Sequence, residues 1–189
     1  MAIAVLGWGS LLWDLDNLAP HVHGDWALQS GPALPMEFSR ISPKRRMGLV
    51  VCLDTTHGVN CPTHAITSTR PDLATARADL ALRERAPLER IGYASAKTGF
   101  GRLPEVVTAV QNWCAIQGWD GAVWTDLEPN FAAHTGQNYT LAAAFAYLQT
   151  LTGENLAEAH RYIQNAPRWT QTPLRNQLQL NPWWQALNF

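Results

Sequence analysis

The stretch Ala4-Val5-Leu6-Gly7-Trp8-Gly9-Ser10-Leu11-Leu12-Trp13-Asp14 decides the fold of this chain. The apolar run from Ala2 to Leu6 predicts a buried strand. Gly-x-Gly-Ser follows directly, and this backbone is able to adopt positive φ and to approach a ligand closely. Consecutive N–H groups in such a turn can form a concavity that holds an anion such as a carboxylate. From the residues alone, a ligand-binding turn and a plain tight turn both remain open.

The overall composition is that of a folded globular protein. The chain has 189 residues, of which 47% are hydrophobic and 15% charged, and its formal net charge is −1. It has no basic run typical of nucleic-acid binding, and its first apolar stretch is too short for a signal peptide or a membrane span. Three cysteines, an odd number, suit a reducing cytoplasm better than a disulfide framework. We expect a single cytoplasmic domain over residues 1–189, without nucleic-acid or membrane partners; its oligomeric state stays open.

The order of the predicted elements favours an α+β architecture. Segments that read as strands come mostly first and segments with helical periodicity come mostly later. Residues 14–31 are expected to form a loop, and residues 172–189 are expected to pack across the body. The predicted strands cover 2–6, 34–41, 48–54, 64–68 and 122–125, and the predicted helices cover 71–85, 104–117, 141–151 and 157–165.

The sequence contains no complete motif for binding a nucleotide cofactor or a metal ion. No third glycine completes a dinucleotide fingerprint after Gly7 and Gly9, and no Gly-Lys-Ser/Thr of a phosphate loop occurs. A second pattern is a C-x4-H-x3-C-x2-H series, formed by Cys52, His57, Cys61 and His64. Its spacing matches no zinc finger, and alternation along a hairpin would send these side chains to opposite faces. We therefore expect no metal and no organic cofactor.

Two carboxylates are candidates for acid–base chemistry. Glu84 ends a predicted helix between Arg83 and Arg85, a pattern more typical of a solvated helix face. Glu89 lies five residues further on. Burial in a pocket would suit either side chain to the role of general base, and the sequence does not rank the two.

These pieces together resemble the γ-glutamylcyclotransferase-like superfamily. The opening is similar to the φ-x-G-Y-G-S-L-φ-W signature of its glutathione-degrading, ChaC-like branch. Arg83-Glu84 at the end of a helix and Gly92-Tyr93 after it extend the resemblance. Further stretches that resemble a bacterial subgroup of the superfamily are 34–42, 122–125, 129–131 and 172–175.

The resemblance implies a fold, a reaction and a site. The implied fold is a small, curved mixed β-barrel with peripheral helices. The implied activity is that of a lyase which converts a small γ-glutamyl compound into 5-oxoproline and a free amine or peptide, without a cofactor. Glu84 is carried over as the general base. The residues implied to line the γ-glutamyl pocket, chiefly through their backbone, are Val5, Leu6, Gly7, Trp8, Gly9 and Ser10.

Two departures from the family pattern define the alternatives. Trp8 stands where the motif has tyrosine, which removes a hydroxyl and enlarges the side chain. The segment between Glu84 and Gly92 is longer than in the ChaC-like pattern, so Glu89 is the alternative base. A non-catalytic module that binds a γ-glutamyl compound or an amino acid is the alternative function. Weaker pocket candidates are Ser39, Arg40 and Tyr93.

Overall fold

The computed structural model describes residues 1–189 and confirms the α+β class. It contains a six-stranded mixed sheet and a three-stranded antiparallel sheet. The chain divides into two compact units, one formed by Met1–Leu34 with Pro62–Leu127 and the other by Pro35–Cys61 with Glu128–Phe189. The expectation of one domain over residues 1–189 stays a prediction, because one domain would unfold both units in a single cooperative transition.

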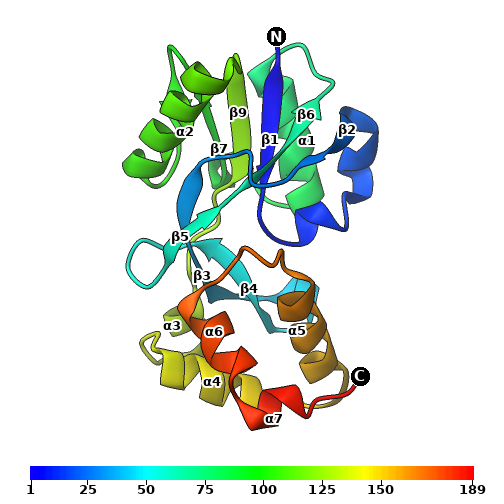
Figure 1. The fold of residues 1–189 in the computed structure, drawn as a ribbon, viewed down its shortest axis with the longest axis vertical. Helices are drawn as coiled ribbons and strands as arrows, with labels where there is room; N and C mark the ends of the chain where they lie inside the picture. The colour runs from blue at the N-terminus through cyan, green and yellow to red at the C-terminus, as the bar shows by residue number, and fades with distance from the viewer. The chain divides into compact units, whose positions relative to one another are not determined.

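The first unit is built on the six-stranded sheet, whose strand order is β2-β6-β1-β9-β7-β8 (Figure 1). Its strands are β1 (Ile3–Gly7), β2 (Val22–Ala27), β6 (His64–Ser68), β7 (Ile91–Ser95), β8 (Gly99–Phe100) and β9 (Gly121–Thr125). Its helices are α1 (Leu73–Glu84), α2 (Pro104–Gln117) and the short 3-10 segments η1 (Ser10–Leu12), η2 (Asp16–His21) and η4 (Leu88–Arg90).

Strand β1 lies inside this sheet and is buried along its whole length. It pairs antiparallel with β6 and parallel with β9, so Leu6 faces Ala65 on one side and Trp124 on the other. A strand enclosed in this way needs apolar side chains on both faces, which explains its continuous hydrophobic run. One face packs against α1 in a core that includes Ile3, Val5, Leu80 and Val123.

Helix α1 begins and ends at identifiable caps. The Asp72 carboxylate accepts a 2.9 Å hydrogen bond from the Thr75 N–H, so the helix starts at Leu73 and Pro71 lies just before it, not at the first helical position. At the other end Arg85 has a φ of +54°, and its N–H bonds the carbonyls of the last turn. The last helical residue is therefore Glu84.

The second unit combines the three-stranded sheet, in the order β4-β3-β5, with five helices (Figure 1). Its strands are β3 (Ala33–Ser42, within this unit from Pro35), β4 (Gly48–Leu53) and β5 (Val59–Pro62, within this unit up to Cys61). The other elements are η3 (Pro43–Arg45), α3 (Phe131–Thr135), α4 (Leu141–Thr150), α5 (Gly153–Asn165), α6 (Pro173–Gln179) and α7 (Pro182–Gln185).

Two predictions need correction. No closed barrel is detected, since the strands form two separate sheets where one curved barrel was expected. The expected loop over residues 14–31 contains η2 and β2. Val22 and His23 pair with β6 at the edge of the sheet, and the register shifts before Ala27 pairs with Ala65. Gly24, at φ +76°, and Asp25 lie in this irregularity, and both are poor strand formers, which explains why the segment does not resemble a strand in the sequence. No helix in the structure has the length and apolar character needed to cross a membrane.

Candidate functional site

The turn after β1 is a short 3-10 segment. The Leu12 N–H donates to the Gly9 carbonyl over 3.1 Å, and the Asp14 N–H donates to the Ser10 carbonyl over 2.9 Å. The N–H groups of Gly9, Ser10 and Leu11 precede these bonds and donate to no group of the protein. Gly9 and Leu11 are buried and Ser10 is half-buried, so these are three neighbouring N–H groups without a partner in the protein.

The glycines of this turn do not use the left-handed conformation that the sequence allows. Gly9 has a φ of −132°, and neither Gly7 nor Gly9 is among the residues with positive φ. Gly7 is required for a different reason. A Cβ atom there would lie 2.7 Å from the Trp26 ring and 3.0 Å from a Leu12 methyl group, so the strand end packs closely against these side chains.

Arg83, near the end of α1, connects the helix to the turn. Its side chain is 2% exposed, and its guanidinium donates in three directions. Nη1 lies 2.7 Å from Glu84 Oε1, while Nη2 lies 3.3 Å from Ser10 Oγ and 2.5 Å from the Asp14 carbonyl oxygen. Because the guanidinium is planar and rigid, it fixes the Glu84 carboxylate relative to the Gly-x-Gly-Ser turn.

The Glu84 carboxylate is held on one side and open on the other. Its side chain is 15% exposed, and Oε1 pairs with the buried Arg83. Oε2 makes no hydrogen bond within the protein. An oriented carboxylate with one unused oxygen is able to accept a proton from a bound molecule, which is the geometry that a general base requires.

The structure thus brings one of the two candidate carboxylates to the predicted turn. Glu84 reaches Ser10 through a single guanidinium, whereas Glu89 lies on η4 with an exposed side chain. Of the other predicted residues, Val5, Leu6 and Gly7 belong to β1, and Trp8 follows it with 5% exposure. Arg83 was not predicted from the sequence as a site residue, because an arginine next to a glutamate at the end of a helix is typical of a solvent-exposed helix face.

The weaker pocket candidates have structural partners. Tyr93, on β7, stacks on Phe100 at a centroid distance of 6.2 Å, and the Arg77 guanidinium lies 5.0 Å from the Tyr93 ring centroid. In the second unit, Arg40 donates to the Glu128 carbonyl over 2.6 Å, and the Ser39 hydroxyl lies 3.4 Å from the Cys52 sulfur. These contacts explain the residues without a ligand.

The Cys/His series does not form a metal centre. No group of three or more His, Cys, Asp or Glu side chains in the structure is placed to hold a metal ion. Cys52 and Cys61 are buried free thiols, and the ring of His57 pairs with the Asp54 carboxylate. His64 is buried on β6, where its Nδ1 accepts a 3.0 Å hydrogen bond from the Gln29 N–H.

Comparison with known proteins adds no relative: no family model, no curated protein and no solved structure matches this chain. The contacts between Ser10, Arg83 and Glu84 are therefore the main evidence about function.

Proposed function

We propose that the protein is a γ-glutamylcyclotransferase-like lyase, which converts a small γ-glutamyl compound into 5-oxoproline and a free amine or peptide. The observation that carries the proposal is the buried Arg83 guanidinium, which bonds both the Glu84 carboxylate and the Ser10 hydroxyl. The motif similarity joins the same residues, although they are more than 70 positions apart in the sequence.

The reaction needs a base and a means of holding a folded-back substrate. The neutral α-amine of the γ-glutamyl group attacks its own γ-carbonyl carbon, forming the new C–N bond of the lactam ring. Glu84 Oε2 accepts the proton that the amine loses and passes it to the leaving nitrogen as the original C–N bond breaks. The atoms balance without water, metal or redox cofactor.

Positioning supplies most of the acceleration in such an intramolecular reaction. A well-oriented internal nucleophile is worth roughly 7–11 kcal/mol of the barrier. The N–H groups of Gly9, Ser10 and Leu11 are the proposed donors to the substrate's α-carboxylate or to the oxyanion that develops on the γ-carbonyl. Trp8, in place of the motif tyrosine, is proposed to narrow the choice of γ-glutamyl compound.

The proposal rests on the site and not on a barrel. The superfamily resemblance implies one curved mixed barrel, and the chain has two separate sheets. What supports the assignment is the pair of Arg83 contacts, to Glu84 Oε1 and to Ser10 Oγ, within the first unit. The cytoplasmic location and the small-molecule partner are parts of this proposal.

The test is to incubate the purified protein with γ-glutamyl dipeptides, γ-glutamylamines and glutathione, and to measure 5-oxoproline by mass spectrometry. Glu84→Gln is the test variant and Glu89→Gln is the matched control on the exposed η4 segment. We expect Glu84→Gln to lower kcat about 10²–10⁴-fold and Glu89→Gln to leave it within about twofold.

Three other results of this experiment would argue against the assigned base or against the enzyme. Turnover that survives Glu84→Gln would show that the base is misassigned. Thermal stabilisation by a γ-glutamyl compound without any 5-oxoproline would favour the non-catalytic binding module. If none of the three substrate classes stabilises the protein or is turned over, both functions are contradicted.

A further inference from the structure

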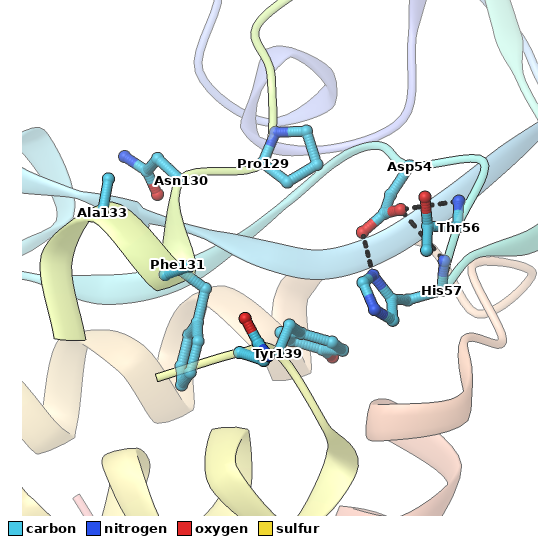
Figure 2. A pocket seen from close by; sticks show the side chains of 10 residues that line it. Asp54, Thr56, His57, Pro129, Asn130, Phe131, Ala133 and Tyr139 are labelled. Carbon is cyan, nitrogen blue, oxygen red and sulfur yellow. Dashed lines mark hydrogen bonds and ion pairs between the residues drawn. The ribbon is translucent and has the colours of Figure 1, made fainter. Parts of the chain in front are cut away.

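The second unit contains a cavity that the proposed reaction does not use. Its volume is about 580 Å³, which lies within the range of small-molecule sites. Asp54, Thr56 and His57 form one side of it, and Phe131 and Tyr139 lie across from them (Figure 2). The remaining lining residues are Pro129, Asn130, Ala132, Ala133 and Asn138.

A tight turn after β4 fixes the Asp54 side of this cavity. Asp54 Oδ1 accepts hydrogen bonds from the backbone N–H groups of Thr56, at 2.9 Å, and His57, at 3.0 Å. The turn leaves no space for a side chain at Gly58, where a Cβ atom would lie 2.3 Å from the Asp54 carbonyl oxygen. The carboxylate is therefore held rigidly, with 2% of its side chain exposed.

The same carboxylate orients the ring of His57. Asp54 Oδ2 lies 3.2 Å from His57 Nδ1 (Figure 2). Burial raises the pKa of Asp54, but hydrogen bonds from Ser39 and from His57 outweigh burial and hold the pKa below its usual value. An ionised carboxylate only accepts hydrogen bonds, so Nδ1 of the neutral ring carries the proton and Nε2 presents a lone pair.

His57 Nε2 is the unused group of this pair. The His57 side chain is 38% exposed, and Nε2 makes no hydrogen bond within the protein. The ring lies 4.9 Å from the Tyr139 ring, and Phe131 meets Tyr139 edge-on at 5.4 Å. A ligand in the cavity would find a hydrogen-bond acceptor next to two aromatic rings.

Charge selects among possible ligands. None of the ten lining residues is Lys or Arg, and Asp54 is the lining residue that is ionised at neutral pH. A buried carboxylate and aromatic faces both attract a cation, and both disfavour an anion. We propose that this cavity binds a small organic amine in its ammonium form, with its N–H donated to His57 Nε2 and its apolar body against Phe131 and Tyr139.

The test uses three probes that share one body and differ in charge: phenethylamine, 2-phenylethanol and phenylacetate. Titration into the full-length protein is followed by calorimetry and by the side-chain ¹⁵N signals of His57. We expect saturable binding in the order amine, alcohol, carboxylate, with the amine at least about tenfold tighter than the carboxylate. Equal or tighter binding of phenylacetate, or no saturable binding of the amine, would overturn the proposal.

Variants then locate the binding. Asp54→Asn retains a carbonyl oxygen for the turn and removes the charge, and His57→Gln removes the ring acceptor. We expect each to weaken the binding of phenethylamine about tenfold. His134→Gln, on the exposed last turn of α3 and outside the cavity lining, is the matched control and should bind as the unaltered protein does.

Circular dichroism identifies any variant that fails to fold, and His57→Gln tests an exposed side chain if Asp54→Asn is unstable. Binding that is unchanged in His57→Gln would overturn the assignment of the site. This inference does not depend on the γ-glutamyl reaction, because it uses only residues of the second unit.

Discussion

Replacing Arg83 by methionine tests the link between α1 and the Gly-x-Gly-Ser turn. Methionine keeps an unbranched apolar stem but provides no donor. The change removes the partners of Glu84 Oε1, Ser10 Oγ and the Asp14 carbonyl at once. It leaves the Glu84 carboxylate, which is 15% exposed, without its counter-charge.

The expected loss of stability follows from the burial of this pair. Removing one partner of a buried ion pair costs about 3–5 kcal/mol. Because water reaches part of Glu84, we expect the lower end of that range, about 3 kcal/mol. For a chain of this size each kcal/mol moves the melting temperature by about 2–4 °C, so Arg83→Met should lower it by about 6–12 °C.

The assay is urea denaturation, with Arg85→Met as the matched control. Arg85 is 72% exposed and reaches Asp16 only at 4.0 Å, so its replacement should change the free energy of unfolding by no more than about 0.5 kcal/mol. Adding Glu84→Gln to Arg83→Met should recover part of the loss, because it removes the unpaired charge. The reasoning is refuted if Arg83→Met and Arg85→Met have the same stability.

Three further predictions concern other parts of the structure. Burial lowers the pKa of His64 from 6.5 to about 4, so the unfolded chain binds the proton more tightly than the folded chain. The stability that the neutral His64 contributes should be fully present above pH 6.5, and the free energy of unfolding should fall by about 3 kcal/mol as the pH is lowered to 4. His64→Gln should make the free energy of unfolding less dependent on pH, as measured by urea titrations at a series of fixed pH values. Gly92→Ala would place a Cβ atom 2.2 Å from the Trp124 ring, so a loss of about 1–3 kcal/mol is expected in thermal unfolding. Asn130→Ala removes hydrogen bonds of 2.7 and 3.0 Å to the backbone of Ile41 and should cost about 1–3 kcal/mol by denaturation, whereas an unchanged midpoint would contradict their contribution.

Much of the fold follows from local pattern. The strand at 64–68 and the helix at 104–117 have the predicted bounds. The helix succeeds because Pro104 suits its first turn, an apolar stripe faces inward, and Gly118, at φ +78°, ends it. Such signals lie within a few residues of one another, so no knowledge of the tertiary structure is needed to read them.

Elements that depend on distant partners were missed. Strand β2 is extended because it pairs with β6, and its own residues give no alternating apolar pattern. The separation into two sheets depends on which strands pair, and the sequence pattern of each strand is the same in a barrel and in an open sheet.

The candidate site was predictable in part. Ala76, Leu80 and Arg83 recur at helical spacing, and all three are buried, so the helix periodicity already places Arg83 on the inward face. The adjacent glutamate conceals this signal, since a charged pair at a helix end usually lies in solvent. The Asp54–His57 pair belongs to no sequence motif, and its orientation depends on a turn that the three-dimensional structure shows.

The most direct test of the central claim compares binding and turnover in Glu84→Gln with a γ-glutamyl dipeptide as the substrate. If Glu84 is the proton acceptor beside the turn after β1, the variant should still be stabilised thermally by the dipeptide while 5-oxoproline release falls at least about a hundredfold. Release at the rate of the unaltered protein would contradict the account.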